Sequence, residues 1–171
     1  MGFESAVKAA PALSGHYRPG LQGLRNVDRR RIHTERPRQI RGSIDLDSAL
    51  RPSQPNQPIW DYCVGLSKNR DEDRALWLEV HPASSRHVDE VLKKWRWLRR
   101  WLPEQAPALD RMSAHYIWLA SGSVALPANS PQRRRIAQSG ILLRSGLLNL
   151  DQLSEWDSGF DTDSERARHG P

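Results

Sequence analysis

The sequence has 171 residues, a net charge of +6 and a single cysteine. This length suits one domain with a hydrophobic core and irregular ends, and a lone cysteine excludes a disulfide framework within the chain and fits a reducing compartment. No apolar stretch approaches the roughly 20 residues that span a bilayer, and the N-terminal sequence lacks the pattern of a signal peptide. We therefore expect a cytoplasmic protein with no membrane partner.

Positive charge is concentrated in three stretches of the chain. Seven arginines lie between Arg25 and Arg41, a second basic group lies at 93–100, and three consecutive arginines occupy 133–135. Basic clusters in separate elements favour nucleic acid as a partner, and ordinary solvated charge is the alternative. The candidate phosphate-binding residues are Arg29, Arg30, Arg31, Lys93, Lys94, Arg96 and Arg100.

The first 58 residues contain few regular signals. Residues 1–42 are rich in Pro, Gly and Arg and show no sustained period, so we expect a basic, largely irregular N-terminal arm with at most a short helix near 21–31. SIDLDSAL at 43–50 alternates briefly, which predicts a strand or a strand leading into a turn. RPSQPNQP at 51–58 is loop-like, since three of its eight residues are prolines.

From residue 60 the apolar pattern predicts a hairpin followed by a helix. WDYCVGL at 60–66 and ALWLEVH at 75–81 have the composition of strands and are joined by a polar connector. Apolar residues recur at intervals of three and four from 88 to 102. A helix is therefore expected at 85–102, capped by Ser84 or Ser85 and followed directly by Pro103.

The remaining elements complete a single α/β domain of the α+β type at 43–150. HYIWLAS at 115–121 predicts another apolar strand, Ser130 and Pro131 start a helix that ends at Gly140, and 141–150 can supply a last strand. The expected architecture is a mixed central sheet with a β-hairpin, covered by helices. Residues 151–171 are acidic and poor in apolar residues, so we expect a flexible tail.

Strand alternation places three polar side chains at one corner of the predicted sheet. Successive side chains point to opposite faces of a strand, so Asp61 shares a face with Cys63, and Glu79 and His81 share a face with Trp77. Matching the apolar faces of the two strands brings Asp61, Glu79 and His81 to the same side. Antiparallel pairing then sets the start of the first strand beside the end of the second.

Two carboxylates beside an imidazole are suited to metal-dependent hydrolysis. Close carboxylates repel each other unless a cation lies between them, and Mg²⁺ or Mn²⁺ binds carboxylate oxygens together with water and phosphate oxygens. His81 titrates near neutral pH and could orient or deprotonate a water molecule. We therefore expect Asp61 and Glu79 to bind the metal and all three residues to be catalytic. The alternatives are that Asp61 caps a strand start or pairs with an arginine, and that Glu79 and His81 are polar residues on a solvent-facing edge.

This arrangement resembles the core of the PD-(D/E)XK nuclease superfamily. The order of elements in that superfamily is a strand with Asp, a hairpin, a strand with Glu-x-Lys, a covering helix and a further strand. In this sequence IWD at 59–61 and EVH at 79–81 stand at the two motifs. The resemblance covers about 43–121. It implies a restriction-endonuclease-like core, Mg²⁺ or Mn²⁺ as cofactor, and action on nucleic acid, DNA in preference to RNA. His81 stands at the lysine position, so Lys93 or Lys94 would have to substitute for that lysine, or the site is catalytically impaired. A further acid of the pattern has three candidates, Glu35, Asp45 and Asp47.

The sequence also allows two functions without catalysis. A nucleic-acid- or protein-binding module of the same fold would show salt-sensitive binding that survives the loss of Asp61 and Glu79. A partner-binding module would order its basic arm or acidic tail only in a complex with a partner protein.

Other reactive residue types are expected to be structural. A zinc site is not expected, because the chain lacks Cys-x-x-Cys and His-Glu-x-x-His and a proline separates His81 from His87. Cys63 is expected to pack between sheet and helix. Trp97 and Trp101 either pack beneath a loop or stack on bases.

Overall fold

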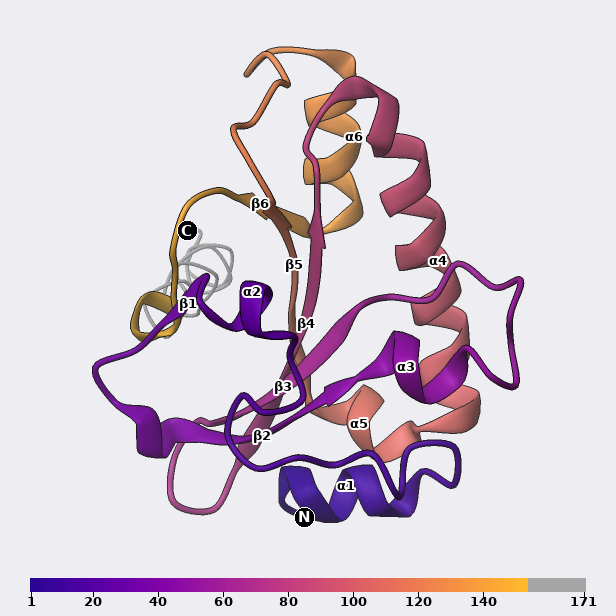
Figure 1. Cartoon of the computed structure of the whole chain (residues 1–171), viewed down its shortest axis with the longest axis vertical. Coiled ribbons are helices and arrows are strands. Elements are labelled where there is room, and N and C mark those ends of the chain that lie inside the picture. Colours follow the sequence, from indigo (N-terminus) through magenta and orange to yellow (C-terminus); the bar gives the residue numbers. More distant parts are fainter. Residues whose placement is uncertain (154–171) are drawn as a thin grey trace, which may run out of the picture.

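The computed structural model describes residues 1–153 of the chain (Figure 1). Its helices are α1 Phe3–Ala9, α2 Asn26–Arg29, α3 Leu46–Leu50, α4 Val88–Gln105, α5 Pro107–Met112 and α6 Pro131–Ser139. Its strands are β1 Ile32–His33, β2 Ile40–Asp45, β3 Tyr62–Ser67, β4 Asp73–His81, β5 Ser113–Ala120, β6 Ile141–Arg144 and β7 Leu148–Asn149. The fold is of the mixed α/β class that the sequence predicts.

Five strands form one mixed sheet in the order β2-β3-β4-β5-β6. β2, β3 and β4 pair antiparallel, whereas β5 is parallel to both β4 and β6. The predicted hairpin is β3–β4, in which Tyr62 pairs with Leu78 and Ser67 with Asp73. The parallel β4–β5 pair requires a crossover connection, which α4 and α5 provide. The hairpin, its covering helix and the next strand therefore follow in the predicted order.

Both faces of this sheet are buried, each against a different part of the chain. Cys63 is fully buried in the larger core with residues of α1, α4 and α5, as expected. Val64, its neighbour in β3, packs on the opposite face with residues from 21–32 and 148–153. Figure 1 shows α4 on one side of the sheet and α2 and β1 on the other. Alternation along β3 therefore separates two apolar sets.

Helix α4 is the longest helix described, at 18 residues. It begins at Val88, directly after a 3-10 turn at Ser85–His87, and ends at Gln105. The predicted end at Leu102 is thus three residues early, because Pro103 lies in the last turn, where its missing N–H removes only one of the final hydrogen bonds. Among residues 1–153, no helix combines the length and the apolar character needed to cross a membrane.

Trp97 and Trp101 of α4, for which the sequence left both packing and base stacking open, belong to the core. Trp97 and Trp101 are 5% and 7% exposed, and their rings stack with centroids 5.7 Å apart. Rings with so little exposed surface cannot receive a base, so packing is the observed alternative.

Helix α6 begins and ends where the sequence predicts. The Ser130 side chain accepts a hydrogen bond from the Arg133 N–H, and Pro131 is the first helical residue. Gly140 follows the helix with a φ of 89°, a left-handed conformation that favours glycine. The chain can therefore turn directly from α6 into β6.

Residues 1–42, expected to be a largely irregular arm, contribute to the core. Phe3, Ala6 and Val7 of α1 are buried. The Phe3 ring lies so close to Gly65 of β3 that a Cβ on this glycine would be 2.2 Å from it. The expected boundary at residue 42 also falls inside β2. The sheet and the N-terminal segment therefore share one core.

A second, two-stranded sheet joins distant parts of the chain. β1 runs parallel to β7, with Ile32 opposite Leu148. The Asp151 carboxylate beside it accepts hydrogen bonds from the Glu35 N–H at 2.7 Å and from Gln39 Nε2 at 2.8 Å, and such bonds lower the Asp151 pKa to about 2. Asp151, expected to open a flexible tail, is thus bound to the folded domain. The rest of that predicted tail, from residue 154, lies outside the described residues.

Candidate functional site

Asp61 and Glu79 meet at the corner of the sheet that the sequence predicts. Because Tyr62 pairs with Leu78, the preceding Asp61 lies opposite Glu79. The two residues bind each other's strands: the Asp61 N–H donates to Glu79 Oε2 at 3.0 Å, and the Val80 N–H donates to Asp61 Oδ2 at 3.0 Å. The two carboxylates are therefore held side by side by backbone hydrogen bonds, with one oxygen of each left for other contacts.

Lys94 of α4 fills the position between these two oxygens. Its Nζ lies 2.5 Å from Glu79 Oε1 and 3.4 Å from Asp61 Oδ1. The side chain of Glu79 is 0% exposed, whereas those of Asp61 and Lys94 are 24% and 15% exposed. Of the two lysines that the sequence offers to this site, Lys94 is the one that reaches it; Lys93 is exposed.

Burial dominates the electrostatics of this cluster of Asp61, Glu79 and Lys94. Burial, reinforced by the charge of Asp61, raises the pKa of Glu79 to about 8 although Lys94 acts in the opposite direction. Burial also raises the pKa of Asp61, against the effect of Lys94 and the Val80 N–H. Burial alone would lower the pKa of Lys94, but the two carboxylates raise it above its usual value. Lys94 thus stays charged while Glu79 can hold a proton near neutral pH.

His81 lies at the same corner, but its ring is oriented toward the start of α4. Its Nδ1 is 3.8 Å from Glu79 Oε1, while its Nε2 is 3.2 Å from both Glu90 Oε2 and His87 Nδ1. Burial lowers the pKa of His81. The three predicted catalytic residues are therefore brought together, with His81 linked to a second group of polar side chains.

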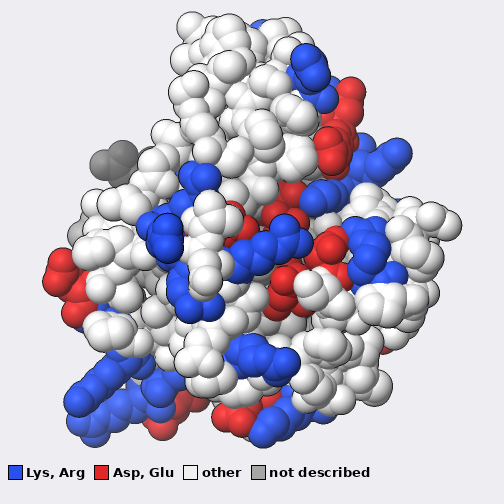
Figure 2. Space-filling model, viewed as in Figure 1, with Lys and Arg blue, Asp and Glu red and all other residues white. Residues whose placement is uncertain are grey.

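An acidic cleft opens at the end of the sheet beside Asp61. It has a volume of about 270 Å³, and its polar lining includes Arg25, Asp28, Asp45, Asp47, Asp61 and His81. Figure 2 shows Asp and Glu side chains gathered near the middle of the face in view, with Lys and Arg side chains around them. Carboxylate oxygens in this number suit a hard divalent cation.

Two of the three proposed additional acids line this cleft. Asp45 caps α3 by accepting from the Ser48 N–H at 2.9 Å, and Asp47 forms an ion pair with Arg51. The third, Glu35, donates its backbone N–H to Asp151 outside the cleft. Asp28, which accepts a 2.6 Å hydrogen bond from the Tyr62 hydroxyl, was missed. It lies in an arginine-rich segment whose position over the sheet no local pattern indicates.

The predicted phosphate-binding residues are distributed over several surfaces. Lys93, Arg96 and Arg100 are exposed on α4, and so is Arg30 after α2. Successive helical residues differ by about 100° around the axis, so Lys93 faces away from the two carboxylates that Lys94 reaches. Lys94 itself is committed to the two carboxylates.

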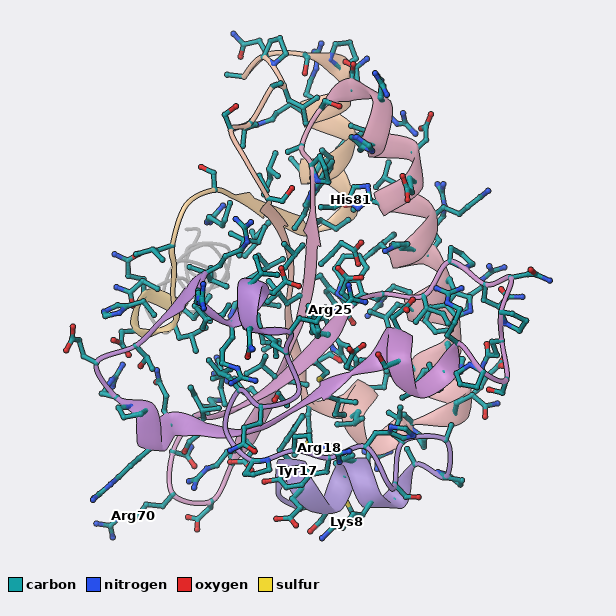
Figure 3. The ribbon with its side chains drawn as sticks, in the orientation of Figure 1. Lys8, Tyr17, Arg18, Arg25, Arg70 and His81 are labelled. Atoms are coloured by element: carbon teal, nitrogen blue, oxygen red, sulfur yellow. The ribbon has the colours of Figure 1, made fainter. Side chains whose placement is uncertain are left out.

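Two of the predicted arginines are turned toward the protein instead. Arg29 donates to the carbonyl oxygens of Leu21 and Leu24 at 3.1 and 3.0 Å, and Arg31 lies 3.9 Å from Asp28. Arg25, absent from the predicted set, lines the cleft together with His81, and both are labelled in Figure 3. It is therefore the arginine placed best to contact a bound anion.

Two groups of side chains could hold a metal ion. Asp61, which lines the cleft, and the fully buried Glu79 behind it supply carboxylate oxygens. His81, His87 and Glu90 bring two ring nitrogens and a carboxylate oxygen within 4.8 Å of one another. The expectation that Pro82 keeps His81 and His87 apart is wrong, because the turn after β4 folds back onto the first turn of α4. The resemblance to the PD-(D/E)XK superfamily stays a prediction. Comparisons of this chain with protein-family models, curated proteins and solved structures gave no match.

Proposed function

We propose that this chain is a metal-dependent nuclease that cleaves phosphodiester bonds of nucleic acid, DNA in preference to RNA. The observation that carries the proposal is the cluster of Asp61, Glu79 and Lys94 beside the acidic cleft. Two strands deliver the carboxylates and the covering helix delivers the ammonium group. The order of these elements is also that of the superfamily pattern, with the lysine supplied by the helix.

The residues of the cluster fit Mg²⁺ or Mn²⁺. Asp61 Oδ1 has only a 3.4 Å contact to Lys94, so it is available to a cation, and Glu79 Oε1 becomes available when the Lys94 ammonium group moves toward a phosphate. When bound, the ion would polarise the phosphoryl oxygen and activate a water molecule. Lys94 would then stabilise negative charge on the phosphate in the transition state.

Proton release accompanies cation binding in this arrangement. With a pKa of about 8, Glu79 holds a proton at neutral pH, and a cation beside its carboxylate would displace that proton. His81, whose Nδ1 is 3.8 Å from Glu79, is the nearest imidazole that could accept it. Arg25, which lines the cleft, and the exposed Arg30 could hold the phosphate backbone on the surrounding surface.

A binding module without catalysis is the second candidate. Its supporting observation is that Glu79 is fully buried and both of its oxygens already have partners, so the cluster can serve as a structural ion network. In that case nucleic acid would bind in a salt-sensitive manner and would remain bound after Asp61→Asn.

The test combines Mg²⁺ calorimetry with cleavage assays on single- and double-stranded DNA and RNA in Mn²⁺. Asp61→Asn should abolish both Mg²⁺ binding and cleavage, and Lys94→Met should retain Mg²⁺ binding but reduce cleavage about 100-fold or more. Asp71→Asn is the matched control, because this aspartate is exposed in the loop between β3 and β4. Absence of Mg²⁺ binding by the wild type, even with an oligonucleotide present, would overturn the nuclease proposal. Salt-sensitive binding without cleavage would establish the second candidate.

A further inference from the structure

A second group of polar side chains lies where β4 passes into α4. His81 is the last residue of β4, His87 directly precedes α4, and Glu90 is in its first turn. His81 Nε2 is 3.2 Å from His87 Nδ1 and 3.2 Å from Glu90 Oε2, and His87 Nδ1 is 3.6 Å from Glu90 Oε2. Two ring nitrogens and one carboxylate oxygen thus form a nearly equilateral triangle.

The edges of this triangle match those of a tetrahedral zinc site. Zinc binds histidine nitrogen and carboxylate oxygen at roughly 2.0–2.2 Å, so two ligand atoms at the tetrahedral angle are separated by about 3.3–3.5 Å. The three observed separations, 3.2, 3.2 and 3.6 Å, bracket this value. A cation placed above the triangle can therefore reach all three atoms with little movement of the side chains.

When Glu90 is ionised, protons on the two histidines do not satisfy all three contacts. A single proton on His81 Nε2 leaves the lone pair of His87 Nδ1 facing the Glu90 carboxylate, and a single proton on His87 leaves the His81 lone pair facing it. With both nitrogens protonated, two N–H groups face each other across 3.2 Å. Each of these three arrangements leaves one repulsive contact, whereas a single cation is attracted to all three atoms.

The backbone holds the two histidines in position. The His81 carbonyl oxygen accepts hydrogen bonds from Trp118 Nε1 at 3.0 Å and from the Ser121 N–H at 3.1 Å. The His87 N–H donates to the Ser84 carbonyl at 3.0 Å, which closes the turn before α4. His87 and Glu90 are three residues apart and so lie on the same side of the helix.

A carboxylate and an open side complete the surroundings. Glu79 Oε1 lies 3.8 Å from His81 Nδ1, beyond hydrogen-bond distance and on the side of the ring away from the triangle. The side chains of His81, His87 and Glu90 are 17%, 28% and 53% exposed. Water can thus reach the group and occupy a fourth position.

We propose that His81, His87 and Glu90 bind a Zn²⁺-type cation, with three protein ligands and a solvent-accessible fourth position. Imidazole nitrogens select ions of the Zn²⁺ and Co²⁺ class over Mg²⁺, which prefers oxygen. This site is distinct from the Mg²⁺ or Mn²⁺ ligands Asp61 and Glu79, and it does not require the proposed nuclease activity. The bound cation would join the end of β4 to the start of α4, the helix that carries Lys94.

The experiment is a Co²⁺ titration of the full, tag-free chain followed by visible absorption, with Zn²⁺ affinity measured by competition against a chromogenic chelator. One equivalent of Co²⁺ should give the intense bands of a tetrahedral complex, and Zn²⁺ should displace it. His87→Ala and Glu90→Gln should each weaken Zn²⁺ binding at least about 100-fold, since losing even an outer partner of a ligand costs 10- to 100-fold. Glu90→Gln keeps a side chain of the same size at a position that is half exposed, so it tests the site without disturbing the core.

The matched control is His33→Ala, which removes another histidine paired with a glutamate. His33 Nε2 is 3.1 Å from Glu35 Oε1, and this exposed pair is not part of a three-ligand group among residues 1–153. His33→Ala and Asp61→Asn should leave Zn²⁺ affinity unchanged. No uptake of Co²⁺ by the wild type, or equal affinity in the wild type, His87→Ala and Glu90→Gln, would overturn the proposal. Because Asp61→Asn removes only the Mg²⁺ ligand, failure of the zinc site and failure of the nuclease proposal give different results.

Discussion

Replacing Glu79 with glutamine tests whether the buried carboxylate holds a proton at neutral pH. Burial raises its pKa from an ordinary 4.5 to about 8 in the folded protein. The folded state then binds a proton that the unfolded state has released, so the stability that this group contributes is complete below about pH 4.5 and is lost as pH rises toward 8. One pKa unit corresponds to about 1.4 kcal/mol. Between about pH 5 and about pH 7, the free energy of unfolding of the wild type should therefore fall by about 2.5 kcal/mol relative to Glu79→Gln.

The assay is urea unfolding of both proteins at the two pH values, followed by tryptophan fluorescence. Comparing each protein with itself removes any constant effect of the substitution. Burial lowers the pKa of His81, which therefore acts with the opposite sign in both proteins. Glu72→Gln serves as control, because this glutamate is exposed and forms an ion pair with Lys68 in the β3–β4 loop. If the difference between wild type and Glu79→Gln is the same at both pH values, Glu79 is ionised in the fold and the assigned proton does not exist.

Three further substitutions test the packing, each by urea unfolding. Phe3→Ala should lower the free energy of unfolding by about 3–5 kcal/mol, because its buried ring fills the space beside β3. A loss below about 1 kcal/mol, as for a surface substitution, would place α1 outside the cooperative core. Gly65→Ala should lower the free energy of unfolding by about 1–3 kcal/mol, because the new Cβ would overlap the same ring. Gly122→Ala is the control and should be nearly neutral, since a Cβ there meets nothing within 4 Å. Equal effects of the two substitutions would contradict the close contact between Phe3 and Gly65. Ser130→Ala should cost about 1 kcal/mol by removing the α6 cap, and an unchanged unfolding midpoint would show that the cap does not matter.

The corner of the sheet could be predicted because strand parity is a strong constraint. A shift of one residue in the β3–β4 register would turn every apolar side chain of one strand to the opposite face, so the alternation alone fixes Asp61 and Glu79 on a common side. The observed pairing of Tyr62 with Leu78 agrees with this. The same parity predicts the face of His81, but the direction in which its ring turns depends on the next element.

The side chains contributed by α4 could not be predicted in the same way. Lys93 and Lys94 differ by about 100° around the helix, and only the packing of α4 on the sheet decides which of them reaches the carboxylates. The contact between His81 and His87 depends on the turn after β4, where the Ala125 N–H donates to the Ala83 carbonyl at 2.8 Å and fixes the path of the chain. That bond joins residues 42 positions apart and has no signature in the local sequence.

The N-terminal helix shows a different limit of sequence patterns. α1 has only seven residues, too few for a period to be distinguished from chance, and its composition is unremarkable for a loop. What orders it is the fit of Phe3 over Gly65, a position in β3 where the absence of a side chain leaves room for a ring. Such complementarity exists only between distant parts of the chain and becomes visible only in the folded protein.

The parallel pairing of β1 with β7 also has a consequence for how the chain folds during synthesis. Ile32 meets Leu148, and Asp151 binds the backbone at Glu35, so the segment around residues 32–39 reaches its final contacts only after nearly the whole described chain has left the ribosome. Closing so long a loop is costly in chain entropy and is normally a late step. The five-stranded sheet can form before it. We therefore expect the pairing of β1 with β7 to form last in folding, after the five-stranded sheet.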